Sequence, residues 1–364
     1  MQILLLGAGG FIGSHLADWF VRDGNHDVIG FDQYDEKLED ARAGSRFHFV
    51  RGDLRECGDQ VRKMVRKADV VVDLIAHANP SLYVKTPMEV FRLNFTENLK
   101  IVDWCVEEGK RLVQFSSCEV YGKTLAAVAR EDLKNPDDPR HAVFGEDTTD
   151  LIMGPVNKQR WIYASAKQLL ERVLHALSLE GKLDYSIIRP FNFIGPRIDY
   201  LTIEQDGNPR VFSHFMTALL TGRPMPLVDG GTRKRCYTYI DDAVDCIARV
   251  ILDKNGVCRN HIFNVGSPYN ETSIAEMAVK MRDIYAAKYR RAGEPLPEIV
   301  NVPAVEFYGE GYEDSDRRIP DITKARTLLG WEPKFDLNET LDRSMRYYVQ
   351  AYRERKIAAA PAKA

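Results

Sequence analysis

The chain has 364 residues, 45% of them hydrophobic, and its formal net charge at pH 7 is −3. This length can bury a large core and is long for one domain, so we predict a larger domain followed by a smaller one. The small net charge gives no electrostatic reason to expect nucleic acid or an anionic membrane as a partner.

A short apolar strand over residues 1–6 opens the chain and runs into the sequence Gly7-x-x-Gly10-x-x-Gly13. A helix over about residues 11–22 is expected next. In a dinucleotide-binding fold the first of these glycines permits the turn, the second lets backbone N–H groups approach a pyrophosphate, and the third lets the helix pack on the strand. An ordinary strand–helix turn is the alternative interpretation.

The start of this strand also bears on localisation. It begins at Met1, and no apolar run in the chain approaches the ~20 residues of a membrane span. We therefore expect no signal peptide and a soluble, cytoplasmic protein.

A second apolar strand, over residues 27–31, ends at Asp32. A carboxylate about twenty residues past the glycines can accept hydrogen bonds from both ribose hydroxyls of a dinucleotide and would repel a 2′-phosphate. The sequence therefore predicts NAD rather than NADP. A strand over residues 46–50 is closed by Gly52 and Asp53, and Asp53 is equally suited to the adenine edge or to an ordinary turn.

The alternation of strands and helices continues along the chain. We predict strands over residues 70–76, 111–117 and 185–190, and helices over residues 88–108, 169–179 and 273–291. Repeated strand–helix units predict an α/β fold with a doubly wound parallel sheet of the Rossmann type, whose ligands bind at the strand C-termini.

The predicted domain boundaries follow from this pattern. Residues 1–190 form the dinucleotide-binding domain and residues 191–350 form most of a smaller α/β substrate domain, with the chain crossing between the two. The low-complexity end of the tail, 351–364, is expected to be disordered.

Tyr163 and Lys167 stand four residues apart, on one face of a predicted helix. Beside a bound nicotinamide, the ammonium would lower the pKa of the phenol, so that tyrosinate takes a proton from a sugar hydroxyl while hydride leaves the same carbon. The pair predicts redox chemistry on an alcohol. A half-buried Tyr beside a solvated Lys is the alternative.

Positive charge follows in the second half of the chain. Arg210 and the run Arg233-Lys234-Arg235 suit a diphosphate, although solvated surface side chains are the alternative. The six cysteines have no metal-ligand spacing, so we expect free thiols and no metal site.

Four motifs together resemble the extended short-chain dehydrogenase/reductase family of nucleotide-sugar enzymes. They are the glycine motif, Ser116-Ser117-x-x-Val120-Tyr121-Gly122, Tyr163-x-x-x-Lys167, and Arg189-Pro190-Phe191-Asn192-x-x-Gly195-Pro196-Arg197. The resemblance spans the chain to about Met345. Residues 154–163 and 307–312 are similar to the UDP-glucuronate-decarboxylating members, and residues 115–123 and 314–321 to those that form UDP-apiose and UDP-xylose.

The resemblance implies an NAD-dependent oxidative decarboxylation of UDP-glucuronate. Oxidation at C4 makes a β-keto acid, which loses CO2 with the C4 ketone as the electron sink. Tyr163 and Lys167 would perform the oxidation, Ser117 would hydrogen-bond the reacting C4 oxygen, and Glu119 and Arg318 would act in decarboxylation and later proton transfers.

The same resemblance assigns the binding residues. The UDP-sugar would be held by Arg160, Asn192, Arg210, Arg235, Tyr308 and Arg318. The NAD site would comprise Gly7, Gly10, Phe11, Ile12, Gly13, Asp32, Asp53, Leu54, Ala76, Asn94, Tyr163 and Lys167.

Residue 118 bears on the product. Members that stop at the 4-keto-pentose have Ser where this chain has Cys118, whereas apiose-forming members have Cys, which suits acid–base work during ring contraction. Those members have a second functional Cys where this chain has Ala78. Cys118 as a small buried residue is the alternative.

Apiose formation alongside UDP-xylose is accordingly the leading expectation. A UDP-4-keto-pentose or UDP-xylose product without ring contraction is the alternative. A 4-epimerase and a non-catalytic NAD sensor are more distant readings.

The family pairs through helices that begin near Met88 and Trp161, so we predict a homodimer formed by a four-helix bundle. Packing of the same apolar faces on the sheet is the alternative.

Overall fold

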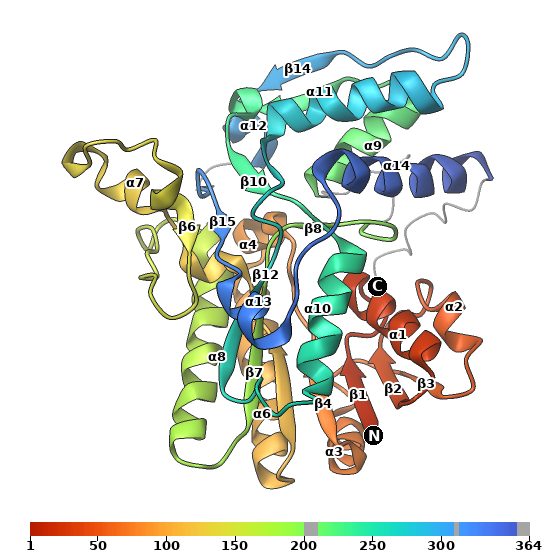
Figure 1. Cartoon of the computed structure of the whole chain (residues 1–364), viewed down its shortest axis with the longest axis vertical. Helices are drawn as coiled ribbons and strands as arrows, with labels where there is room; N and C mark the ends of the chain where they lie inside the picture. The colour runs from red at the N-terminus through yellow and green to blue at the C-terminus, as the bar shows by residue number, and fades with distance from the viewer. Residues whose placement is uncertain (200–209, 309–312, 355–364) are drawn as a thin grey trace.

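The computed structural model describes residues 1–199, 210–308 and 313–354. Its centre is a seven-stranded sheet of order β12-β7-β5-β4-β1-β2-β3 in which all neighbours pair in parallel (Figure 1). The strands are β1 (Gln2–Leu6), β2 (Asp27–Asp32), β3 (Phe47–Arg51), β4 (Val70–Asp73), β5 (Arg111–Phe115), β7 (Tyr185–Pro190) and β12 (His261–Val265).

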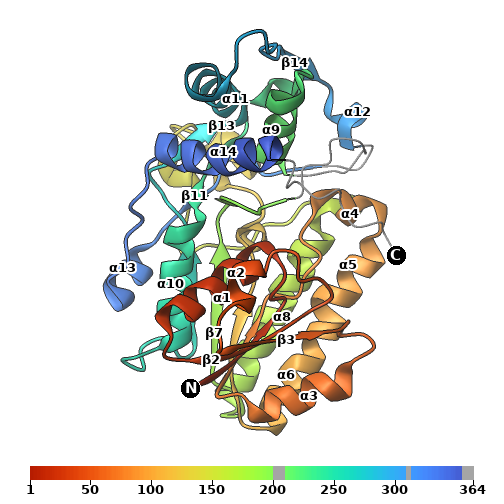
Figure 2. The same cartoon turned by 90° about the vertical axis from the view of Figure 1, so that its right-hand side faces the viewer.

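The two faces of this sheet bury separate cores, because successive side chains of a strand point to opposite sides. In β1, Ile3 and Leu5 belong to one core and Leu4 and Leu6 to the other. The helices of the first core include α1 (Phe11–Asp23) and α10 (Ile240–Leu252), and those of the second include α3 (Gly58–Lys67), α6 (Asn98–Glu107) and α8 (Ile162–Leu179). Figure 2 shows α1 and α10 on one side and α6 and α8 on the other. The predicted doubly wound α/β fold is confirmed.

The strand order reverses between β1 and β4, which are neighbours in the sheet. In open α/β sheets, ligands bind at such a switch point, outside the carboxyl ends of the strands. The segments that follow β1 and β4 approach each other closely here: a Cβ on Gly7 would lie 3.1 Å from the backbone of Leu74.

Two predicted strands end earlier than expected, each because a side chain turns the backbone. The predicted strand over residues 70–76 stops at Asp73, whose Oδ1 accepts the N–H of Ile75 at 2.9 Å. The predicted strand over residues 111–117 stops at Phe115 because Ser117 caps the short helix η2 (Cys118–Tyr121), accepting the N–H of Glu119 at 3.2 Å.

Two predicted helices are present with altered winding. The helix predicted over residues 88–108 is built from α5 (Pro87–Phe91), the π-helix η1 (Arg92–Glu97) and α6. The helix predicted over residues 273–291 is built from α11 (Ile274–Ile284) and the π-helix η7 (Tyr285–Tyr289). Single-turn π segments are not encoded in the apolar spacing that predicts a helix.

The chain after β7 builds most of a smaller region beyond the C-terminal ends of the sheet, at the top of Figure 1. It contains α9 (Val211–Thr221), the parallel pair β9 (Met225–Val228) and β14 (Ile299–Val302), α11, and α14 (Leu337–Arg353). Strand β12 lies in the main sheet although it follows much of this region in the chain. The predicted tail begins inside α14, and residues 355–364 lie outside the described part of the chain.

Short strand pairs connect distant segments. Strand β6 (Val143–Phe144) pairs with β15 (Ile319–Pro320), β10 (Lys234–Cys236) with β13 (Glu271–Ser273), and β8 (Phe193–Ile194) with β11 (Thr238–Tyr239). The remaining helices are α2 (Glu39–Arg42), α4 (Pro80–Lys85), α7 (Leu125–Val128), η3 (Arg130–Asp132), η4 (Pro139–Ala142), η5 (Gln159–Trp161), η6 (Asp229–Gly231), α12 (Ala304–Tyr308) and α13 (Thr323–Leu329). Within the described ranges, none of the helices is both long and apolar enough to span a membrane.

Candidate active site

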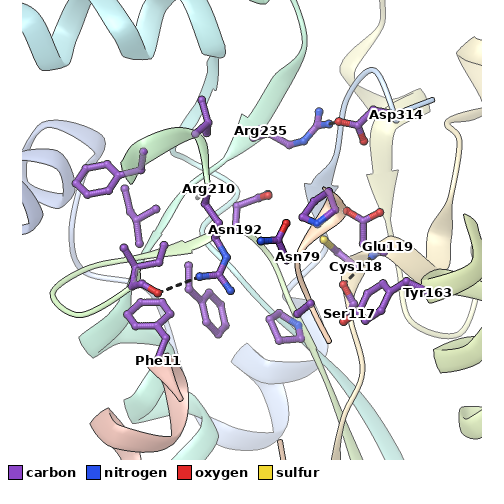
Figure 3. A pocket seen from close by; sticks show the side chains of 18 of the residues that line it. Phe11, Asn79, Ser117, Cys118, Glu119, Tyr163, Asn192, Arg210, Arg235 and Asp314 are labelled. Carbon is purple, nitrogen blue, oxygen red and sulfur yellow. Dashed lines mark hydrogen bonds and ion pairs between the residues drawn. The ribbon is translucent and has the colours of Figure 1, made fainter. Parts of the chain in front are cut away.

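A cavity of about 470 Å³ lies at the carboxyl ends of the central strands, between the sheet and the smaller region. It is lined by most of the predicted site residues, namely Gly7, Gly10, Phe11, Ile12, Gly13, Ala76, Ser117, Cys118, Glu119, Arg160, Tyr163, Lys167, Asn192, Arg210, Arg235 and Arg318. Figure 3 shows Ser117, Cys118, Glu119 and Tyr163 on one side and Phe11 of α1 on the other.

Four predicted residues are not among those that line the cavity in the described parts of the chain: Asp32, Asp53, Leu54 and Asn94. The side chain of a fifth, Tyr308, lies outside the described part of the structure. Tyr308 is the last residue of α12, and the motif residues 309–312 that follow it lie outside the described residues.

The glycines of the first loop leave room where other residues would not fit. Gly7 has a φ of +84°, and a Cβ on Gly13 would overlap the carbonyl oxygen of Gly7. A Cβ on Gly10 would meet only the Gly7 oxygen, at 3.3 Å, although Gly10 lines the cavity. Gly10 precedes α1, which has no side-chain cap at this end. The loop therefore fits a pyrophosphate held by the N-terminus of the helix.

Asp32 supports this loop from outside the cavity lining. Its Oδ2 accepts the N–H of Gly9 at 2.9 Å and its Oδ1 accepts the N–H of Tyr34 at 3.1 Å. Burial raises the pKa of Asp32, and these backbone hydrogen bonds oppose the rise. A carboxylate retains lone pairs beyond these bonds, so the ribose contact stays a prediction.

The other residues outside the lining have local roles. Asp53 accepts the N–H and the Nε–H of Arg55, and this side-chain contact with Arg55 holds the pKa of Asp53 below its usual value. Leu54 is buried in the core with α3. Asn94 donates to the carbonyls of Val90 at 2.8 Å and His77 at 3.2 Å. Their contacts with NAD also stay predictions.

Helix α8 places Tyr163 and Lys167 one turn apart, and both side chains are buried. The Lys167 ammonium donates to Asn98 Oδ1 at 3.2 Å and to the carbonyl of Phe115 at 3.0 Å, and burial lowers the pKa of Lys167 to about 8. Burial raises the pKa of Tyr163, and the hydrogen bond with Ser117 opposes the rise. In the protein without a cofactor, burial is therefore the largest influence on the phenol pKa, and the lowering expected beside a bound nicotinamide stays a prediction.

Tyr83 of α4 packs on the ring of Tyr163, a contact that the sequence did not predict. The rings of Tyr83 and Tyr163 are stacked with centroids 4.6 Å apart and an interplanar angle of 4°. The guanidinium of Arg160 lies 5.2 Å from the centroid of the Tyr83 ring. No local motif marks Tyr83, because the stack is made between two separate helices.

Five buried or half-buried side chains form what we call the charge cluster: Glu119, Arg160, Arg235, Asp314 and Arg318. Glu119 contacts Nη1 of Arg318 through Oε1 and Nη2 of Arg160 through Oε2, each at 2.6 Å. Asp314 Oδ2 accepts from Arg235 at 2.7 Å. Asp314 Oδ1 accepts from Arg318 at 3.1 Å and from Arg160 at 3.4 Å. Three guanidinium groups thus share two carboxylates.

The cluster keeps its acids ionised. Burial would raise the pKa of Glu119, but the charges of Arg160 and Arg318 outweigh it and hold that pKa below its usual value. The pKa of Asp314 is also lowered, with burial opposed mainly by Arg235. A carboxylate held in this way is poorly suited to donate a proton.

Cys118 lies at the edge of the charge cluster. Its Sγ is 3.7 Å from Nη1 of Arg318. Burial raises the pKa of the thiol, and the charge of Arg318 opposes that rise.

Pairing between distant strands assembles the cluster. Arg235 lies in β10, opposite Thr272 of β13. Arg318 directly precedes β15. The pairing of β15 with β6 brings Arg318 to the part of the chain between β5 and α8, which also contains Glu119. Asp314 belongs to residues 314–321, which resemble the family, but the sequence alone predicts no role for it.

Two predicted substrate residues lie apart from the cluster on the cavity wall. Arg210 precedes α9 and donates to the carbonyl of Ile198 at 3.1 Å and to Asp199 Oδ1 at 2.8 Å. Asn192 has a φ of +42° and donates to the carbonyl of Cys236 at 3.4 Å. Figure 3 shows Arg210 between Phe11 and the group around Tyr163.

Comparison with known proteins is consistent with this architecture. Residues 3–266 match the NAD dependent epimerase/dehydratase family. The chain is 39% identical over 363 residues to UDP-D-apiose/UDP-D-xylose synthase 1 of Arabidopsis thaliana, an alignment that covers 97% of this chain and 92% of the relative.

Solved structures agree with the fold. The PbgP3 protein of Burkholderia pseudomallei superposes with a TM-score of 0.84 at 34% identity, covering 98% of both chains. A UDP-glucuronic acid 4-epimerase from Bacillus cereus, in complex with UDP-glucuronic acid and NAD, superposes with a TM-score of 0.77 at 22% identity and covers 97% of this chain and 100% of the epimerase. The second likeness concerns the fold alone.

Proposed function

This chain belongs to the NAD dependent epimerase/dehydratase family, and from that membership we propose that it oxidises and decarboxylates UDP-glucuronate to give UDP-apiose and UDP-xylose. The observation that carries the proposal is one cavity that joins Tyr163 and Ser117 to Glu119 and Arg318. The similarity to the Arabidopsis synthase supports the substrate and the products.

The oxidation step requires a base at the C4 hydroxyl. NAD+, when bound, accepts the hydride from C4. Tyr163 takes the hydroxyl proton, and Ser117, which hydrogen-bonds the Tyr163 phenol, is placed to hold the same oxygen. Lys167 supplies a buried ammonium one turn along α8, fixed by Asn98.

The decarboxylation step follows from the ketone. The bond between C5 and the carboxyl carbon breaks, its electron pair moves toward the C4 oxygen as an enolate, and CO2 leaves. Arg318 and Glu119 would act at this centre, which is supported by the cavity that they share with Ser117 and Tyr163, and the latter two would stabilise the enolate oxygen. UDP-xylose would follow when C5 takes a proton from water and the C4 ketone takes a hydride that bound NADH would supply, with Tyr163 returning its proton to the C4 oxygen.

The alternative product has a specific observation in its favour. Ring contraction to UDP-apiose needs an additional proton-transfer group, for which Cys118 is the candidate, but burial raises the pKa of this thiol. The second cysteine expected of apiose-forming members is replaced by Ala78, which lines the cavity. These features favour UDP-xylose or the UDP-4-keto-pentose as the second candidate.

A direct assay tests the function. The purified protein is incubated with UDP-glucuronate and NAD+, and CO2, NADH absorbance and the sugar product are followed together. CO2 release with little net NADH and a mixture of UDP-apiose and UDP-xylose is the expected result. UDP-galacturonate without CO2 would identify a 4-epimerase instead, and an unreacted substrate would favour an NAD sensor.

We further propose a homodimer formed through α5–η1–α6 and α8. Support comes from Met88 and Leu169, which remain 54% and 44% exposed on these helices and do not pack on the sheet. Light scattering at micromolar concentration should give twice the mass of the chain, and a monomer mass would refute the dimer.

The six free cysteines suit a reducing compartment, and we propose the cytoplasm.

A further inference from the structure

Asp314 contacts three arginines, which is more than a carboxylate that only holds a loop in place would need. It is the one acid of the charge cluster that reaches all three of its arginines, with Oδ2 on Arg235 and Oδ1 shared by Arg160 and Arg318. Arg160 and Arg318 are each 1% exposed. Without Asp314, these two buried cations would lose one of the two carboxylates that they share in the described part of the chain.

The geometry around Arg318 shows what Asp314 controls. One terminal nitrogen, Nη1, is held by Glu119 at 2.6 Å, and the other, Nη2, by Asp314 at 3.1 Å. Two carboxylates on two nitrogens fix the plane of the guanidinium. With one of them removed, the group can rotate about the remaining contact.

The charge balance matters as much as the orientation. Three arginines and two carboxylates leave the charge cluster with a net charge of about +1, and loss of Asp314 would raise it to about +2. Decarboxylation disperses the negative charge of the substrate carboxylate, so a site that holds this carboxylate too firmly stabilises the ground state more than the transition state.

We propose that Asp314 is a positioning residue for the decarboxylation step, which it serves by orienting Arg318 and by limiting the positive charge that faces the substrate carboxylate. This role rests on the proposed function. It leaves the oxidation step to Tyr163, Ser117 and Lys167, none of which contacts Asp314 in the interactions described above.

The test separates the two steps in the full-length protein. Asp314→Asn keeps the side-chain shape and removes the charge. It should slow CO2 release from UDP-glucuronate at least about tenfold while C4 oxidation continues, so that NADH absorbance accumulates. Binding of UDP-glucuronate, measured by calorimetry with NADH in place of NAD+ so that no oxidation occurs, should be equal or tighter, because the added positive charge attracts the substrate.

Asp316→Asn is the matched control. Asp316 lies two residues away in the same loop before β15, and its carboxylate accepts from the Thr124 hydroxyl at 2.9 Å rather than from an arginine. This variant should release CO2 at the wild-type rate without NADH accumulation.

Other outcomes overturn the inference. Oxidation and CO2 release that fall by the same factor in Asp314→Asn would show a merely structural role, and unchanged rates would show none. If Asp314→Asn does not fold by circular dichroism, Asp314→Glu, which keeps the charge but displaces it, should show a smaller accumulation of NADH in the same direction, and none would refute the role. A wild-type protein that releases no CO2 would instead overturn the proposed function.

Discussion

The two halves of the cavity are built in different ways. The core of the predicted cofactor half comes from one continuous stretch, residues 2–32, in which β1, a glycine loop, α1 and β2 follow one another, and Ala76 joins it from the segment after β4. The charge cluster draws on four segments between residues 119 and 318, because Asp314 and Arg318 come from the same one. The first half is governed by steric limits on the backbone, and the second by a balance of charges that exists only when distant strands pair.

This difference separates what each half tolerates. A backbone that nearly touches itself excludes any side chain, so the loop can be damaged by a single methyl group. A buried group of ions tolerates shape changes better than it tolerates losing one charge, because the remaining partner is left without its counter-ion. Substitutions can therefore affect one half and leave the other intact.

The largest effect is expected where the two halves meet, at Tyr163. Tyr163→Phe removes the proton acceptor but no charge from either half, so turnover should fall by about 10²–10⁴-fold while UDP-glucuronate and NAD bind nearly as before. CO2 release and calorimetric binding measure the two quantities. Tyr185→Phe, at the end of β7 that lies away from the cavity, is the control and should match the wild type. Near wild-type turnover in Tyr163→Phe would remove this residue from its role.

The next largest effect should be confined to the cofactor half. A Cβ on Gly13 would overlap the carbonyl oxygen of Gly7, so Gly13→Ala should cost about 1–3 kcal/mol in the free energy of unfolding and weaken NAD binding at least about tenfold. A Cβ on Gly10 meets only the Gly7 oxygen, at 3.3 Å, and Gly10→Ala should therefore weaken NAD binding with little loss of stability.

Urea unfolding and NAD titration of both variants measure this contrast. UDP binding should be spared in each, since the charge cluster is untouched. Equal losses of stability in the two variants would show that the steric account of the loop is wrong.

A smaller effect is expected at Asp32, which sharpens the comparison because it supports the loop by hydrogen bonds rather than by packing. Asp32→Ala removes the acceptor for the N–H of Gly9 and the proposed ribose contact, so NAD affinity should fall about tenfold and the preference over NADP should narrow. Asp27→Ala, at the opposite end of β2, is the control. Unchanged affinity for both cofactors would place Asp32 outside the NAD site.

The same contrast decides how much could be read from the sequence. The glycine loop, Asp32 and the Tyr163/Lys167 turn are each local patterns with one structural solution, and the sheet order follows from repeated strand–helix units. The positions of Glu119 and Arg318 came from the resemblance to a family. No spacing rule could have joined them, because their contact depends on the pairing of β6 with β15.

Two features escaped prediction for physical reasons. The π segment η1 interrupts a helix whose apolar spacing is ordinary, and the stack of Tyr83 on Tyr163 depends on how α4 and α8 pack. Lys167 shows a further limit. Burial raises the pKa of Tyr163 and lowers that of Lys167, so the effect of the ammonium on the phenol beside a bound nicotinamide stays a prediction. Burial depends on the whole fold and is not visible in a four-residue spacing.

The smallest effect on the rate of CO2 release is expected at Cys118, which lies at the edge of the charge cluster and is the residue proposed to decide the product. Oxidation and decarboxylation do not use the thiol, so Cys118→Ser should leave both nearly unchanged. Ring contraction needs a group that exchanges protons near neutral pH, and a serine hydroxyl ionises far less readily than a thiol. Burial raises the pKa of the Cys118 thiol, but the charge of Arg318, whose Nη1 lies 3.7 Å from Sγ, opposes that rise. The variant should therefore lose UDP-apiose and keep UDP-xylose or the 4-keto-pentose, as resolved by NMR of the products. Cys57→Ser, at a half-buried site outside the cavity lining, should keep the wild-type ratio. If Cys118→Ser makes UDP-apiose in unchanged proportion, or the wild type makes none, the thiol is a small buried side chain and the simpler decarboxylase assignment holds.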